Sequence, residues 1–188
     1  MTGTPWAAGA TLFDRAGATL LDRMIARLTA QRDALNWAVE RVEGRTGPAL
    51  EIGLGKGRTY DYLRARLGVE QVYAFDDGLR VPPGCEPPPE RLFLGDFRDT
   101  LAAVRATLGG TVRLAHADFG SPDQIHDREQ AAWLAPMIDA LMQPGGVVVS
   151  DRPLSCAGWQ PVEPPGSGPA WRYHAWIVRP GDGQVSQS

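Results

Sequence analysis

Apolar residues near the start of the chain recur at the three- and four-residue spacing of an amphipathic helix. The recurring positions run from Leu21 to Val42, with arginines and acids between them, and Gly44 ends the pattern. A gap between Leu28 and Leu35 leaves open whether the segment is one helix or two. The sequence therefore predicts an N-terminal helical cap over residues 1–46, made of one or two helices.

From residue 47 to residue 151, short apolar runs alternate with stretches of helical periodicity. Five runs bounded by turn residues predict strands, and the stretches between them predict helices. Pro136 must kink or start the helix that contains it. The alternation predicts a three-layer α/β sandwich with a mostly parallel sheet. Expected strands are 48–53, 70–78, 91–97, 111–118 and 145–151, and expected helices are 58–68, 99–110 and 127–146.

After residue 151 the alternation stops. Residues 152–169 are rich in loop formers, and residues 170–178 alternate like one last strand, which we expect to be antiparallel at the sheet edge. The chain of 188 residues is then a single domain with three parts. These are the helical cap, a ligand-binding core over residues 47–151, and a C-terminal loop and edge strand over residues 152–188.

Three glycines fall within five positions where the first predicted strand ends: Gly53, Gly55 and Gly57. In open α/β sheets, ligands bind outside the carboxyl ends of the strands, and a glycine loop marks such a site. A phosphate-binding P-loop needs a lysine followed by Ser or Thr, whereas Lys56 is followed by Gly57. A dinucleotide loop needs a small third residue, but Arg58 occupies that position. The bland alternative is a tight strand-to-helix turn that binds nothing.

Charge and cysteine usage narrow the possible functions. The net charge is −3 and no basic patch is evident, which argues against a nucleic-acid-binding protein. Cys85 and Cys156 lack metal-ligand spacing, which favours reduced thiols in the cytoplasm. We see no signal peptide, and no apolar run approaches the ~20 residues of a membrane span. We therefore expect a cytoplasmic protein without a membrane or nucleic-acid partner.

The pattern Glu51-x-Gly53-x-Gly55-x-Gly57 resembles the first motif of the class I S-adenosylmethionine (SAM) dependent methyltransferases. In that family, an acidic residue near the end of the first strand precedes G-x-G-x-G. Later segments follow in the family's order, namely VYAFD, FLGDF, LAHADFG and MQPGGVVVSD. The resemblance covers residues 50–151 and extends to a small bacterial group of S-adenosyl-L-methionine methyltransferases. It implies a Rossmann-like fold, with SAM as cofactor and S-adenosylhomocysteine (SAH) as product.

The resemblance also implies how the glycine loop would bind SAM. Glu51 would meet the cationic end of the cofactor, directly or through water, and the glycines would let the backbone lie against the ligand. Thr59 can cap the helix that follows the loop. The positive N-terminal end of that helix would favour the SAM carboxylate.

Two further strand ends supply the other expected cofactor contacts. Asp76 would bind both ribose hydroxyls, although it could simply cap a turn, and Asp77 is the alternative carboxylate. Asp96 and Phe97 would contact adenine, although Asp96 could instead cap the next helix. The full set of expected cofactor-binding residues is Glu51, Gly53, Gly55, Gly57, Thr59, Asp76, Asp96 and Phe97.

Candidate catalytic residues follow the fourth and fifth predicted strands. Asp118 and Asp151 should both face the cleft, where two carboxylates suit a general base, a divalent-metal pair or a cationic substrate. Asp118 could instead only cap the loop before Gly120. We find no third metal ligand and expect no metal. His126, in the next loop, is the best-placed histidine for a general base, although a solvated histidine needs no role.

The methyl acceptor is the open part of the prediction. The chain lacks the Asn/Asp-Pro-Pro-Tyr/Phe signature that similar enzymes use on nucleic-acid bases and protein glutamine, so we expect a small-molecule acceptor. Two alternatives to a methyltransferase remain. One is a non-catalytic SAM-fold module that binds a ligand, and the other is a nicotinamide-dependent oxidoreductase, which Arg58 disfavours.

The C-terminal tail bears on assembly. It is too short for the helix and two strands that usually end this family's fold, which would leave one sheet edge uncovered. Because an uncovered edge favours pairing with another chain, we expect a homodimer or a larger homo-oligomer.

Overall fold

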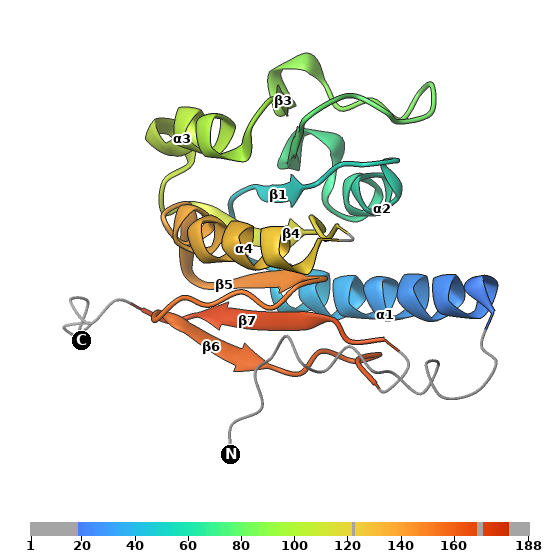
Figure 1. Ribbon diagram of the computed structural model, residues 1–188. Coiled ribbons are helices and arrows are strands. Elements are labelled where there is room, and N and C mark those ends of the chain that lie inside the picture. Colours follow the sequence, from blue (N-terminus) through green and yellow to red (C-terminus); the bar gives the residue numbers. More distant parts are fainter. Residues whose placement is uncertain (1–18, 122, 169–170, 181–188) are drawn as a thin grey trace.

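A computed structural model describes residues 19–121, 123–168 and 171–180 (Figure 1). Its helices are α1 (Leu20–Arg41), α2 (Arg58–Leu67), α3 (Phe97–Leu108) and α4 (Gln124–Asp139), with short 3-10 turns η3 (Val69–Gln71) and η4 (Pro89–Arg91). Its strands are β1 (Ala49–Ile52), β2 (Val72–Asp76), β3 (Leu92–Leu94), β4 (Val112–Ala117), β5 (Met142–Ser150), β6 (Trp159–Val162) and β7 (His174–Val178). The segment that bears on a signal peptide, residues 1–18, lies outside the described residues.

The strands form one sheet in the order β3-β2-β1-β4-β5-β7-β6. Strands β1 to β5 are parallel, and β7 is antiparallel to both β5 and β6. Helices α1 and α2 pack on one face of the sheet and α3 and α4 on the other, each over its own apolar cluster (Figure 1). The predicted three-layer, mostly parallel α/β sandwich is therefore confirmed.

The C-terminal end of the sheet differs from the prediction. Strand β6 lies inside residues 152–169, which we expected to be a loop, and it pairs with β7. The two-strand ending is therefore present without a preceding helix, and β6 rather than β7 is the edge strand. Pro161 sits in this short strand, and a proline on an edge strand discourages pairing with another chain. The premise from which we predicted an oligomer, an ending too short to cover β7, is therefore wrong, because β6 covers β7.

The N-terminal segment forms one continuous helix. Thr19 and Asp22 make a reciprocal capping box at the start of α1. The gap in the apolar pattern is occupied by Gln31, which is buried and faces polar partners rather than the core. The first turns of α1 extend past the core, so that Leu21 and Ile25 are exposed although they belong to the apolar pattern.

Helix α4 also differs from the predicted range 127–146, because it ends at Asp139 and β5 already begins at Met142. The helix begins at Gln124, three residues earlier than predicted, because Asp123 caps it. Pro136 lies inside α4 near its last turn and does not start it. In the part of the chain that the structure describes, no helix is long and apolar enough to cross a membrane.

Candidate functional site

The glycine loop joins β1 to α2, and the space around each of its three glycines is different. A Cβ on Gly53 (φ +92°) would lie 2.0 Å from the backbone oxygen of Asp118, so only glycine fits there. Gly57 (φ +74°) is the N-cap of α2, and a Cβ there would lie 2.8 Å from Val81 Cγ1. A Cβ on Gly55 (φ +52°) would meet no atom within 4 Å. The loop is therefore open towards solvent at Gly55.

A cavity of about 230 Å³ lies beside the glycine loop. Its walls come from the first half of α1, from the loop itself and from the residues that follow β4. It therefore lies at the carboxyl ends of β1 and β4, where open α/β sheets bind their ligands. The residues that line it include Arg27, Gln31, Gly55, Thr59, Asp118 and Gly120.

Asp76 ends β2, and its carboxylate reaches the glycine loop. Oδ2 accepts a hydrogen bond from the backbone N–H of Gly55 at 2.7 Å. Oδ1 accepts from the backbone N–H of Gly78 at 3.2 Å and from Arg80 Nη1 at 3.0 Å. Asp76 is buried, whereas Asp77 is exposed and pairs with Arg80. Of these two neighbouring carboxylates, it is Asp76 that contacts the loop.

Asp96 and Phe97 follow β3, two strands away from the glycine loop. Asp96 is the N-cap of α3 and accepts the backbone N–H of Arg98 at 2.7 Å, so the capping interpretation is confirmed. Its side chain is exposed, and Phe97 packs against the core beneath α3 and α4. Neither residue lines the cavity beside the loop. Contact with adenine stays a prediction for both.

A chain of hydrogen bonds runs through the protein beneath this cavity. The Thr59 hydroxyl donates to Glu51 Oε1, and Glu51 Oε2 lies 2.8 Å from His116 Nδ1. His116 Nε2 lies 2.7 Å from the Tyr173 hydroxyl, which accepts a hydrogen bond from Gln31 Nε2 at 3.1 Å. Glu51 and His116 are register partners on β1 and β4, and neither has exposed surface.

These contacts change two expectations about the loop. Thr59 does not cap α2, because Gly57 is the N-cap and the helix already begins at Arg58. The Thr59 hydroxyl binds Glu51 instead. Both carboxylate oxygens of Glu51 are hydrogen-bonded, and the residue has no exposed surface. Of its two partners, Thr59 lines the cavity, so Glu51 can influence a ligand there only through Thr59.

The pKa values of the two buried rings in this hydrogen-bond chain, His116 and Tyr173, are both raised. Burial disfavours the protonated form of His116, but the carboxylates of Glu51, Asp118 and Asp151 together raise its pKa above the usual value. Burial, followed by the charges of Asp118 and Asp151, raises the pKa of Tyr173 well above the usual value. Tyr173 is therefore a neutral phenol, and the partner of Glu51 is an imidazole that favours its charged form.

Asp118 follows β4 and is held by two side chains of α1. Arg27 Nη2 donates to its Oδ1 and Oδ2 at 2.6 and 2.9 Å, and Gln31 Nε2 donates to Oδ2 at 2.7 Å. Arg27 Nε is buried and has no hydrogen-bond partner among the described residues. The guanidinium lies 5.8 Å from the centroid of the Trp171 ring. Sequence reasoning missed Arg27 and Gln31, and the gap in the apolar pattern of α1 was the available signal.

Asp151 follows β5, and only 5% of its surface is exposed. The backbone N–H of Phe119 donates to Oδ1 at 3.3 Å, and Arg152 Nη1 lies 3.7 Å from Oδ2. Burial, and next the negative charge of Asp118, raise the pKa of Asp151 to about 7 against the opposing charges of Arg152 and Arg27. The structure thus brings the two candidate carboxylates together, and Asp151 titrates near neutral pH.

His126 lies in the first turn of α4 and not in a loop. Its backbone N–H donates to the capping residue Asp123 at 3.1 Å, and its side chain is exposed. No hydrogen bond or ion pair in the structure joins its ring to Asp118 or Asp151. In the described ranges, no group of three or more His, Cys, Asp or Glu is arranged to hold a metal ion.

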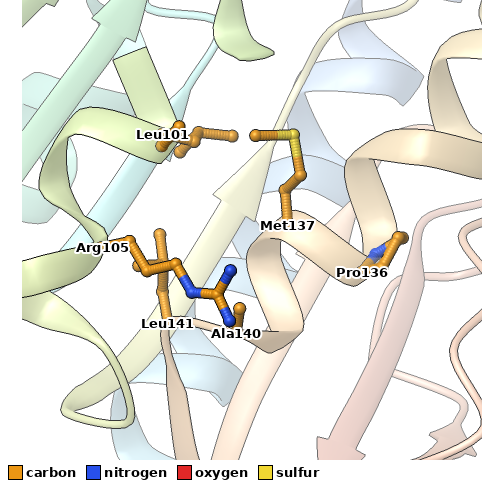
Figure 2. Close-up of a pocket in the computed structure, with 7 residues that line it drawn as sticks. Leu101, Arg105, Pro136, Met137, Ala140 and Leu141 are labelled. Carbon is orange, nitrogen blue, oxygen red and sulfur yellow. The ribbon is translucent and has the colours of Figure 1, made fainter. Parts of the chain in front are cut away.

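A second crevice lies between α3 and α4, and Figure 2 shows its side chains. It is lined mainly by Leu101, Met137 and Leu141, with Arg105 at its side. These residues belong to the middle and later turns of α3, to the last turn of α4 and to the link between α4 and β5. Because helices of an α/β sheet run back antiparallel to the strands, these turns lie towards the amino ends of the strands. The crevice is therefore remote from the glycine loop.

Comparisons with known proteins agree with this geometry. A family model described as S-adenosyl-L-methionine methyltransferase matches residues 18–177. The crystal structure of an S-adenosyl-L-methionine methyltransferase from Silicibacter pomeroyi DSS-3 is 32% identical, with a TM-score of 0.79 over 86% of this chain and 99% of that chain. The chain also resembles the 1,6-didemethyltoxoflavin-N1-methyltransferase of Burkholderia thailandensis, solved with SAH, at 18% identity and a TM-score of 0.47 over 96% and 92% of the two chains. No curated protein matches the chain.

The fold is that of the class I SAM-dependent methyltransferases. The chain belongs to the S-adenosyl-L-methionine methyltransferase family, and SAM is its cofactor. The site fits that cofactor on two observations. Gly55 opens onto space that a side chain would occupy, and the buried Arg27 Nε is a donor without a partner at the cavity wall.

Proposed function

We propose that this methyltransferase acts on a small-molecule acceptor, with Asp118 and Asp151 on the acceptor side of the site. One observation carries the proposal: the glycine loop and Asp118 line one cavity, with Asp76 bonded to the loop from the end of β2 and Asp151 following the neighbouring strand β5. When bound, SAM supplies a methyl group on a positively charged sulfur. The protein's own task is to align the acceptor with that methyl and to exclude water.

We assign the cofactor contacts along the row of strand ends. Gly53 and Gly55 would lie against the ligand, Asp76 would bind the ribose hydroxyls, and Asp96 with Phe97 would reach adenine. The order of β1, β2 and β3 in the sheet supports this assignment, because it places the three strand ends side by side. The buried Arg27 Nε and the exposed side chains of Lys56 and Arg58 at the cavity suit the SAM carboxylate.

We assign the proton-accepting role to Asp151 rather than to Asp118. A general base works best when its pKa lies near the working pH. Burial and the charge of Asp118 raise the pKa of Asp151 to about 7, whereas Asp118 is already paired with Arg27. An acceptor that must lose a proton would pass it to the Asp151 carboxylate. His126 keeps no supporting contact, so we give it no part in this scheme.

A small acceptor is favoured over a nucleic acid by charge. The net charge is −3, and the cationic side chains at the cavity are matched in part by Asp118. A non-catalytic SAM-binding module is the second candidate. It would bind SAM and SAH in the same cavity but transfer no methyl group.

The proposed assignment of Asp76 is tested by thermal-shift titration of the wild type, Asp76→Ala and Asp77→Ala with SAM, SAH and NAD. A ligand at a hundredfold excess over its Kd adds about 2.7 kcal/mol. That corresponds to a rise in Tm of about 5–10 °C for a chain of this size. We expect SAM and SAH to raise Tm of the wild type and of Asp77→Ala, and Asp76→Ala to bind both at least about tenfold more weakly.

Asp77→Ala is the matched control, since it removes an exposed carboxylate one residue away. Equal weakening in the two variants would remove Asp76 from the ribose site. A rise in Tm with NAD alone would contradict the cofactor assignment itself.

We also propose a homodimer, on a ground different from the sheet edge. Leu20, Leu21 and Ile25 on the first turns of α1 are 82%, 67% and 55% exposed, and a second copy would cover them. Light scattering on the eluting protein should give twice the monomer mass, and Leu21→Glu with Ile25→Glu should halve it. A monomeric wild type would contradict the proposal.

Cytoplasmic location also stays a prediction, supported by the unpaired thiols of Cys85 and Cys156.

A further inference from the structure

The ends of three neighbouring strands place three backbone segments in a row. Ile52 pairs with Ala117, and Ala117 pairs with Ser150, so Gly53, Asp118 and Asp151 follow in register on β1, β4 and β5. Adjacent strands lie about 4.8 Å apart. Asp151 is thus two strands from the glycine loop, on the same edge of the sheet as the cavity. Gly120, which lines the cavity, lies so close that a Cβ there would be 2.4 Å from Asp151 Oδ2.

Three carboxylates near the carboxyl ends of these strands each form a close ion pair with a cationic side chain. Glu51 is paired with His116 at 2.8 Å and Asp118 with Arg27 at 2.6 Å. The fully buried Asp127 of α4 takes Arg152 Nε at 2.8 Å.

Asp151 differs from these three carboxylates. The nearest charged nitrogen to its Oδ2 in the structure is Arg152 Nη1, at 3.7 Å, and that guanidinium is already bound to Asp127. Its Oδ1 accepts a single backbone N–H at 3.3 Å. Asp151 is a buried carboxylate whose charge is only weakly balanced by the protein, next to a cavity that receives a cationic cofactor.

We propose that Asp151 is the residue that distinguishes the charged methyl donor SAM from the neutral product SAH. The inference rests on the proposed function, because it requires SAM in the cavity beside the glycine loop. The two molecules share adenine, ribose, ammonium and carboxylate groups and differ in the sulfur: SAM carries a methyl and a positive charge there. An ionised Asp151 attracts that charge and gains nothing from SAH.

The same arrangement balances charge through one turnover. The acceptor's electron pair forms the new bond to the methyl carbon, and the pair of the broken S–C bond stays on sulfur, which becomes neutral. The acceptor's proton passes to the Asp151 carboxylate, which also becomes neutral. The attraction between Asp151 and the cofactor is therefore lost at the moment that SAH forms, and this favours release of the product.

The preference should depend on pH with a known sign. The pKa of Asp151, raised by burial and by Asp118, is about 7, so Asp151 is ionised above pH 7 and neutral well below it. The preference for SAM is then present above pH 7 and lost as the pH falls through this value. His174 of β7 stays neutral throughout, because burial lowers its pKa to about 4. His116, with its raised pKa, is the other group near this edge that can titrate in the same range.

The test is calorimetric titration of SAM and of SAH at several pH values between about 5.5 and 8. The measured quantity is the ratio of the Kd of SAH to the Kd of SAM, compared between variants, because titration of the ligands' own groups is the same for every variant. We compare the wild type, Asp151→Asn, Asp151→Ser and, as matched control, Glu40→Gln. Glu40 is an exposed carboxylate near the end of α1, beside the amino ends of the strands.

For the wild type and Glu40→Gln we expect the ratio to rise about tenfold with pH, with a midpoint near 7. For Asp151→Asn and Asp151→Ser we expect a constant ratio near the acidic value of the wild type. Asp151→Ser replaces Asp151→Asn if the asparagine variant does not fold. The pH dependence of the wild-type ratio is a test even without either variant.

Two results would overturn the inference alone. One is binding of SAM and SAH by the wild type with a ratio that does not change with pH. The other is a pH-dependent ratio that persists in both Asp151 variants, which would transfer the effect to His116. Failure of SAM and SAH to bind at every pH is a different result, because it would contradict the proposed function as well.

Discussion

Replacing Asp151 by asparagine should stabilise the protein by about 2–4 kcal/mol at pH 8 and by about 1–2 kcal/mol at pH 5. The pKa of the buried carboxyl is about 7 in the folded protein, above its ordinary value of 3.8. The folded protein therefore keeps a proton that the unfolded chain has already lost between these two pH values. Stability of the wild type falls as the pH rises through this window, and asparagine cannot titrate.

The measurement is urea unfolding of the wild type and Asp151→Asn between pH 5 and pH 8, with Glu40→Gln as an exposed control. The free-energy difference between Asp151→Asn and the wild type should grow steadily with pH, whereas that of Glu40→Gln should stay constant. Parallel profiles for the wild type and Asp151→Asn would show that the carboxylate is ionised in the folded protein without cost. A gain in stability together with a lost preference for SAM would be a trade of stability for function at one residue.

Alanine at Gly53 and alanine at Gly55 should fail in opposite ways. At Gly53 the added Cβ would lie 2.0 Å from the backbone oxygen of Asp118, and φ is +92°. Overpacking against backbone and left-handed strain together predict a loss of about 3–5 kcal/mol. At Gly55 φ is +52° and no atom lies within 4 Å, so only about 1–2 kcal/mol of backbone strain is expected.

Cofactor binding should separate the same two variants. Gly55→Ala places its methyl group in the space that the ligand would use, so we expect a folded protein with SAM and SAH binding weakened at least about tenfold. Gly53→Ala should first show a lowered Tm without ligand. Wild-type SAM affinity in Gly55→Ala would mean that the cofactor does not lie against this position. Wild-type stability in Gly53→Ala would mean that the loop can move away from Asp118.

Structural features that depend on residues close together in the sequence were predicted correctly. The alternation of strands and helices, the glycine loop and the carboxylate at the end of β2 depend on neighbours within a few residues, and these patterns carry their own signal. The capping role of Asp96 is equally local, and it was one of the two interpretations that the sequence left open. The prediction for Thr59 was wrong because it depends on a contact that is not local: the Thr59 hydroxyl binds Glu51 on another element.

The remaining errors come from contacts between distant segments. Gln31 interrupted the apolar pattern of the first helix without an evident reason, because its hydrogen-bond partners, Asp118 and Tyr173, lie far along the chain. Strand β6 was hidden because it carries Pro161 and only four residues, so it exists by pairing with β7. Leu21 fits the helical period but is exposed. The period indicates that a helix has an apolar face, but it does not indicate which element, if any, packs against that face.

The hydrogen-bond chain beneath the cavity has a consequence for the order in which the protein matures. Thr59, Glu51 and His116 belong to the first two-thirds of the chain, but the hydroxyl that joins His116 to Gln31 is that of Tyr173, just before the last strand in sequence. During synthesis the early strands leave the ribosome first, and domains form as their parts emerge. The hydrogen-bond chain beneath the cavity stays incomplete until β7 has inserted between β5 and β6. A truncated chain that stops short of this strand can hold the glycine loop and still lack a finished site, so the methyl donor meets a complete pocket only in a fully made protein.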